Sequence, residues 1–113
     1  MKTFKYRPEK MFKSDEGDTK SPFVGVVEIE VPLYVERLDL VKSLDIDPNN
    51  PGLDNAVDLI KETKKRIKSI KLEAKGQTDK IESFDDLSYY KEGADIINDI
   101  GRMMVNGFPL GNH

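Results

Sequence analysis

The chain contains no cysteine and no tryptophan, and its single histidine is His113. Without cysteine there can be no disulfide and no thiolate metal site. Without an imidazole elsewhere, a Ser–His–Asp triad has no base to orient it. Neither a Walker pattern nor a GxGxxG motif occurs, and the acidic turns near Asp15 and Asp45 lack the spacing of a calcium loop. We therefore predict no enzyme activity, no catalytic residue, no cofactor and no metal site.

Long apolar runs are also missing. No segment approaches the roughly 18 consecutive apolar residues expected of a membrane-spanning helix. Lys2 and Lys5 near the N-terminus are not followed by the apolar segment of a signal peptide. These features predict no membrane partner and a cytoplasmic location.

The residues that are present favour one small globular domain spanning 1–113. Charged residues make up 35% and apolar residues 37% of the 113-residue chain, which indicates a modest core under a highly charged surface. The formal net charge of −3 arises from many charges of both signs, so no overall field attracts nucleic acid. Residues 1–22 include a polar, turn-rich run and are predicted to form a peripheral extended arm or loop.

The clearest strand pattern covers residues 23–31 (FVGVVEIEV). Apolar residues alternate there with two glutamates, so one face is expected to pack against the core. Gly25 on the apolar face indicates a bulge or a close approach by another element. A second strand is predicted at about 3–7, with Phe4 and Tyr6 on one face, paired antiparallel with the first.

Two helices and a further strand are predicted in the middle of the chain. Pro32 suits a helix start, and Leu33, Leu38 and Val41 lie near helical spacing, which predicts a helix over about 33–44. A narrow apolar stripe at alternating spacings of four and three residues predicts a second helix over about 54–68. Alternation then favours a short strand over about 69–75.

The last predicted helix covers about 84–106. Ser83 and Asp86 resemble a capping box at its start, Gly93 suggests a break within it, and Gly107 closes it. Together the elements predict an α+β fold with N-terminal antiparallel strands.

Apolar residues gather at the end of this last helix and just beyond it. Methionine adapts to irregular partner surfaces, although methionine at helical spacing also commonly packs in a core. Phe108 is expected to fold back on its own helix, and two adjacent tyrosines offer aromatic anchors near the helix start. The candidate partner-binding residues are therefore Tyr89, Tyr90, Met103, Met104, Phe108 and Leu110.

A basic face is the second candidate surface. Lys61, Lys65 and Lys68 are expected on one side of the second helix, within a basic strip over 61–75 that could contact phosphates. No aromatic platform or glycine-rich loop is interleaved with this strip. Carboxylates such as Glu62 also lie at a spacing along the helix that allows ion pairs with the basic residues of the strip. These features favour a solvated, salt-bridged face over a nucleic-acid site.

The order of the predicted elements and the sequences of several segments resemble those of the small tail assembly chaperones of long-tailed bacteriophages. The segments that carry the resemblance cover most of the chain: FKYRPEKMF (4–12), FVGVVEIEVPLYVERLDLVKSL (23–44), KKRIKSIKLEA (64–74), IESFDDLSYY (81–90) and NGFPLGN (106–112).

The resemblance implies a non-enzymatic protein that works in the cytoplasm of the infected host. Such chaperones bind the long helical tape measure protein and help tail tube subunits to assemble around it. The family supplies no catalytic residue to transfer. A chaperone for this partner needs an apolar surface with charged flanks that accepts amphipathic helices. Whether the protein forms a homo-oligomer is left open.

Two alternatives remain beside the chaperone. A structural virion component would use the N-terminal segment 1–12 and the charged loop that follows it as a strap between subunits. A small nucleic-acid-binding regulator would use the strip 61–75.

Overall fold

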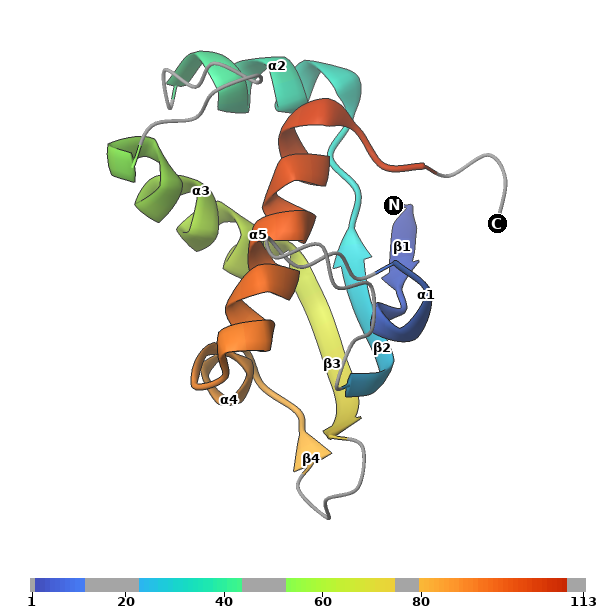
Figure 1. Ribbon diagram of the computed structural model, residues 1–113. Helices are drawn as coiled ribbons and strands as arrows, with labels where there is room; N and C mark the ends of the chain where they lie inside the picture. The colour runs from blue at the N-terminus through green and yellow to red at the C-terminus, as the bar shows by residue number, and fades with distance from the viewer. Residues whose placement is uncertain (1, 12–22, 44–52, 75–79, 110–113) are drawn as a thin grey trace.

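The computed structural model describes residues 2–11, 23–43, 53–74 and 80–109. Within these residues it shows an antiparallel four-stranded sheet and five helices, which confirms the predicted α+β class (Figure 1). The strands are adjacent in the sheet in their order along the chain: β1 (Thr3–Tyr6), β2 (Phe23–Glu30), β3 (Ile67–Ala74) and β4 (Lys80–Ile81).

The first strand lies at an edge of the sheet and contributes to the core. In its antiparallel register with β2, Phe4 is opposite Ile29 and Tyr6 is opposite Val27, which confirms the predicted pairing. Both aromatic side chains are buried. The prediction of a peripheral arm over 1–22 is therefore wrong for β1, because burial of two aromatic rings outweighs the polar character of the residues that follow. A short helix, α1 (Pro8–Met11), comes next, and residues 12–22 lie outside the described part.

The predicted strands at 23–31 and 69–75 are β2 and β3, which pair with each other along their length. Gly25 in β2 has a φ of +140°, and a Cβ built on it would meet the carbonyl oxygen of Lys71 in β3. The glycine therefore marks a close approach between strands. The irregularity in register falls elsewhere, between Glu28 and Ile29.

The two predicted central helices are present as α2 (Tyr34–Ser43) and α3 (Leu53–Arg66). The second ends earlier than predicted, because β3 begins directly at Ile67. The continuous helix predicted over 84–106 is divided into α4 (Phe84–Ser88) and α5 (Lys91–Asn106).

Capping residues define the limits of this last pair of helices. The hydroxyl of Ser83 accepts a hydrogen bond of 3.0 Å from the amide of Asp86, as the capping-box pattern predicts. Gly107 has a φ of +104°, and its amide donates to the carbonyl of Met103, which closes α5. The break expected near Gly93 lies instead at residues 89–90. A Cβ on Gly93 would meet the carbonyl of Leu87, so this glycine lets α5 pack closely against α4.

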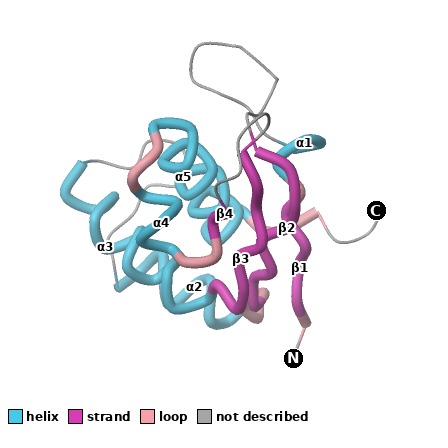
Figure 2. Tube along the Cα trace, turned by 90° about the horizontal axis from the view of Figure 1, so that it is seen from below, coloured by secondary structure: helices cyan, strands magenta, loops and turns pink. Residues whose placement is uncertain are grey.

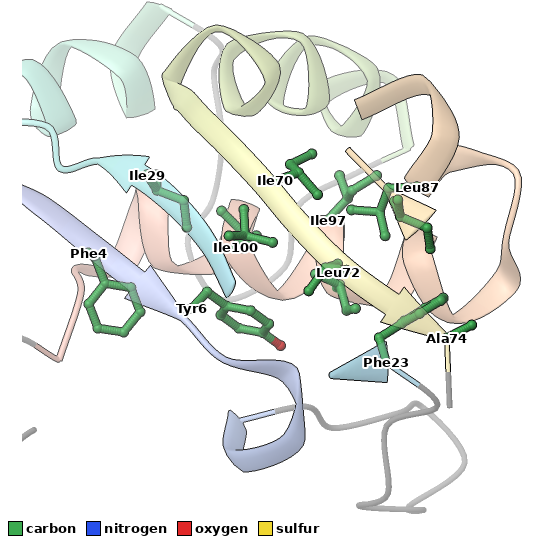
Figure 3. Close-up of a cluster of buried hydrophobic side chains, with 13 residues drawn as sticks. Phe4, Tyr6, Phe23, Ile29, Ile70, Leu72, Ala74, Leu87, Ile97 and Ile100 are labelled. Carbon is green, nitrogen blue, oxygen red and sulfur yellow. The ribbon is translucent and has the colours of Figure 1, made fainter. Parts of the chain in front are cut away.

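The main core lies between the sheet and α5. In Figure 2, helices α2 to α5 lie together to one side of strands β1 to β3. Figure 3 shows side chains from all three strands converging with those of α4 and α5. The buried residues of this cluster are Phe4, Tyr6, Phe23, Val27, Ile29, Ile70, Leu72, Ala74, Ile81, Leu87, Ile96, Ile97 and Ile100.

A second, smaller cluster lies at the C-terminal end of α5, where α2 crosses it (Figure 1). Leu59 from α3 packs there with Met104 and Val105 from α5. Leu40 and Val41 cover this cluster from α2. We call these five residues the helical cluster.

Candidate protein-binding surface

The most exposed apolar group in the described residues lies on α2 and at the residue just before it. Leu33, Tyr34, Val35 and Leu38 expose 71, 65, 66 and 49% of their surface, and none of the residues of α2 is buried. Isolated apolar residues are common on protein surfaces, but contiguous ones indicate an interaction site. Leu38 follows Tyr34 and Val35 by one helical turn, so the side chains are neighbours. We call these four residues the α2 row.

Two further apolar residues of α2 pack inward. Leu40 and Val41 contact the helical cluster, while the residues of the row remain exposed. Leu33 and Leu38, which lie near helical spacing with Val41, are exposed, whereas Val41 packs against the helical cluster. Three consecutive apolar residues at 33–35 exceed what one helix face can bury, and this was the signal for the exposed row.

An arginine holds the aromatic ring of the row. The guanidinium carbon of Arg37 lies 5.2 Å from the centre of the Tyr34 ring, within cation–π range. The same guanidinium lies against Gly107, because a Cβ built there would meet its Nη1 atom. Tyr34 is therefore exposed and yet held in place through the end of α5.

A glutamate holds the start of α2. The amide of Leu33 donates a 2.9 Å hydrogen bond to Oε1 of Glu36, and Nη2 of Arg66 lies 3.2 Å from Oε2. The backbone hydrogen bond, followed by the bond from Arg66, lowers the pKa of Glu36 below its usual value. Arg66 also lies 3.9 Å from Glu30 at the end of β2. The start of α2 is thus linked to both α3 and the sheet.

Met104 is not a surface residue, contrary to its place among the candidate partner-binding residues. It is fully buried in the helical cluster, beneath α2. The physical reason is that a helix distant in sequence covers the end of α5 and buries the thioether there. Met103 is partly buried and packs against the main core.

The other candidates in this group divide between packing and exposure. The ring of Phe108 lies 5.3 Å from that of Phe4, so it packs against the first strand as well as against its own helix. Tyr90 is partly buried and makes an edge-on contact of 5.5 Å with Phe23. Tyr89 is 85% exposed. Leu110 lies outside the described residues.

The predicted basic face is interrupted by carboxylates. Lys61 and Lys65 are exposed on α3, but Lys68 belongs to β3, so the three lysines do not share one helix face. Nζ of Lys65 lies 3.1 Å from Glu62, and Nζ of Lys68 lies 3.1 Å from Glu30. This arrangement is a salt-bridged surface in which two of the three positive charges have a nearby negative charge.

A shallow hollow beside β4 is the second structural candidate. Its charged lining residues are two lysines and two glutamates: Lys71, Lys80, Glu73 and Glu82. The opposite charges balance, and the hollow offers no concentrated charge to a ligand. It therefore gives less indication of function than the α2 row.

Over the described ranges, no group of three or more histidine or acidic residues is placed to hold a metal ion, and no helix is long and apolar enough to cross a membrane. Tyr89 and the α2 row lie at opposite ends of α5 (Figure 1), so they do not form one surface. No protein-family model, curated protein or solved structure matches the chain.

Proposed function

We propose that the protein is a non-enzymatic assembly chaperone of bacteriophage tails, and that it binds its partner through the α2 row. The observation that carries the proposal is the exposure of four apolar side chains at the start of α2, a helix in which no residue is buried. Exposed apolar surface is costly in water and gains free energy when a partner covers it.

The tail-assembly part of the proposal rests on the resemblance described above. The partner in that setting is the tape measure protein, whose long helices present apolar stripes before the tail tube encloses them. A row of apolar side chains along a helix is suited to covering such a stripe. The proposed place of action is the host cytoplasm, with the tail tube protein as a second partner.

The basic face supports a nucleic-acid role less well. Lys65 and Lys68 already lie close to Glu62 and Glu30, and phosphate contacts would have to compete with these ion pairs. The α2 row offers a single aromatic ring, that of Tyr34, whereas single-stranded nucleic acid is bound by several aromatic side chains on which successive bases stack.

The proposal is tested by co-expressing the protein with a fragment of the tape measure protein and measuring the soluble fraction of the fragment. The wild-type protein is expected to keep the fragment soluble, and Leu38→Glu is expected to abolish this effect. Val24→Ser is the matched control, because it alters an exposed apolar residue at the start of β2, away from the α2 row. An equally insoluble fragment with and without the protein would contradict the proposal. Recovery of the protein in purified phage particles would instead support the structural alternative.

A further inference from the structure

We infer that α2 is a removable cover over a helix-binding site on α3 and α5. The site consists of Leu59, Met104 and Val105, the three buried members of the helical cluster, and we call these residues the α2 seat. Its occupant is a partner helix that carries the seat-facing chemistry of α2 itself. The inference goes beyond the proposed function and does not depend on it, because the seat lies beneath α2 whereas the α2 row is exposed.

The cover is lightly attached. All residues of α2 are exposed except Arg37, Leu40 and Val41, and these three are only partly buried. Glu36 adds an ion pair with Arg66, but both side chains keep contact with water, and such pairs contribute little to stability. A helix held by so few buried side chains opens at a lower free energy than the core.

The surface beneath α2 is apolar and is held in shape by α3 and α5 themselves. A Cβ built on Gly101 of α5 would lie 3.5 Å from Leu59 and 3.6 Å from the hydroxyl oxygen of Thr63, so the two helices are in close contact beside the seat. Lifting α2 therefore exposes Met104 and Val105 on a preformed pair of helices. Amphipathic helices bind to apolar surfaces of this kind, and methionine adapts to their side chains.

The present cover shows which side chains the seat accepts. Leu40 and Val41 pack against it. Glu36 and Arg37 precede them by one helical turn and therefore lie on the same side of α2. A partner helix needs two adjacent aliphatic residues to replace Leu40 and Val41, because opening leaves the apolar surface of the seat without its cover.

The contacts of the two charged residues fix their order. Oε2 of Glu36 lies 3.2 Å from Nη2 of Arg66 in α3, whereas Glu30 approaches that guanidinium only to 3.9 Å. The Arg37 guanidinium lies against Gly107 at the C-terminal end of α5, where the helix dipole is negative.

Neighbouring charges along the two helices already pair with each other. Glu62 lies 3.1 Å from Lys65 in α3, and Asp99 lies 3.7 Å from Arg102 in α5. The contacts of the cover therefore define the partner. It is a helix with an acidic residue, a basic residue, two residues of any kind and two aliphatic residues, in this order.

A covered site gives a signature that an open surface does not. While α2 occupies the seat, a partner helix binds only the fraction of molecules in which α2 has lifted, so the measured affinity is reduced by that fraction. A substitution that loosens α2 and leaves the seat intact is therefore expected to strengthen binding, although it removes contacts from the folded protein.

A designed peptide tests the inference on the full chain. The peptide carries glutamate, arginine, leucine and valine at the spacing of residues 36, 37, 40 and 41 on an alanine-rich helix of about four turns, without the apolar residues of the α2 row. The matched control peptide exchanges the glutamate and the arginine, so its composition and net charge are the same. Fluorescence anisotropy measures affinity, and amide chemical shifts locate the site. We expect shifts around the seat on α3 and α5, and roughly fivefold weaker binding of the control peptide.

Four variants of the protein separate cover from seat. Leu40→Ser loosens the cover and is expected to raise the affinity for the designed peptide roughly tenfold. Glu36→Gln, a milder change, is expected to raise it roughly threefold. Val105→Ser, added to Leu40→Ser, alters the seat and is expected to cancel the gain. Val24→Ser, on β2, is expected to leave the affinity unchanged, and circular dichroism checks that each variant is folded.

Three results would overturn the inference. These are equal affinities for the two peptides, chemical shifts away from the seat, and affinities that neither Leu40→Ser nor Glu36→Gln raises. A dimer of the chain alone in analytical ultracentrifugation that dissociates when the designed peptide is added would assign the seat to α2 of a second copy, and would overturn its assignment to a partner protein.

Discussion

The hydroxyl of Tyr6 donates a 2.7 Å hydrogen bond to Oδ2 of Asp99, which joins the first strand to the last helix across 93 positions of sequence. Tyr6 is fully buried, and the Asp99 side chain is only 15% exposed. Nη2 of Arg102 lies 3.7 Å from the other carboxylate oxygen. The buried hydroxyl and the carboxylate thus satisfy each other, and the arginine offsets the negative charge.

Tyr6→Phe is expected to lower the free energy of unfolding by about 1–3 kcal/mol, because it leaves a largely buried carboxylate oxygen without its donor. The ring still fills its place in the core, so the loss reports on the hydrogen bond. Urea denaturation followed by circular dichroism measures the change. Tyr89→Phe is the control, since it removes a hydroxyl from an exposed ring and should change stability by less than about 0.5 kcal/mol. Equal stabilities of wild type and Tyr6→Phe would contradict the prediction.

Because of the same tyrosine, we expect the stability of the fold to depend on pH in the alkaline range. Burial, followed by the hydrogen bond to Asp99, raises the pKa of Tyr6 above its usual value of 10.0. Above pH 10 the unfolded chain loses this proton while the folded chain retains it, so unfolding becomes more favourable. The stability advantage of wild type over Tyr6→Phe should be constant below pH 10. It should then shrink by up to about 1.4 kcal/mol per pH unit above that value. Urea denaturation of both proteins between pH 8 and about 11 measures this difference in stability. A difference that stays constant over this range would contradict the raised pKa of Tyr6.

Two glycines should respond in opposite directions to the same change. Gly25→Ala places a Cβ against the Lys71 carbonyl in a backbone conformation with φ of +140°, and is expected to destabilise the fold by about 2 kcal/mol or more. Gly101→Ala, inside α5, places its Cβ 3.5 Å from Leu59, an ordinary van der Waals contact. Alanine also favours the helix, so this variant should gain about 0.5–1 kcal/mol. Thermal denaturation of the two variants measures both effects, and stabilisation by Gly25→Ala would contradict the close strand approach.

Local patterns predicted much of this fold. Alternation identified β2, with Phe23, Val27 and Ile29 buried, because a half-buried strand has a two-residue period. Capping chemistry at Ser83 and Gly107 located the start of α4 and the end of α5. The two-residue strand β4 and the four-residue helix α1 are too short to show any period, and no pattern predicted them.

The candidate surface was harder to predict, as Met104 and Leu38 illustrate. Both are large apolar residues at helical spacing, yet Met104 is buried and Leu38 is about half exposed. Which one is covered depends on where α2 crosses α5, a contact between segments more than 60 positions apart. Periodicity describes one helix at a time and contains no information about that crossing.

The attachment of α2 leads to a prediction about local opening. Its hold on the rest of the protein consists of Leu40 and Val41 on the helical cluster and of surface contacts such as Glu36 with Arg66. Elements with few buried residues open at lower free energy than the core. We therefore expect α2 to lift from α5 without global unfolding.

The absence of cysteine allows a direct measurement of this opening by thiol labelling. Val105→Cys places a thiol under α2, and Ile100→Cys places one in the main core on the same helix. In native buffer the first should react with a thiol reagent at least about tenfold faster than the second, since only the first is exposed by local opening. Adding Glu36→Gln removes the charge that Arg66 contacts, and should accelerate labelling at position 105 but not at position 100. Equal labelling rates at the two positions, after correction for the global stability of each variant, would show that α2 opens only when the whole protein unfolds.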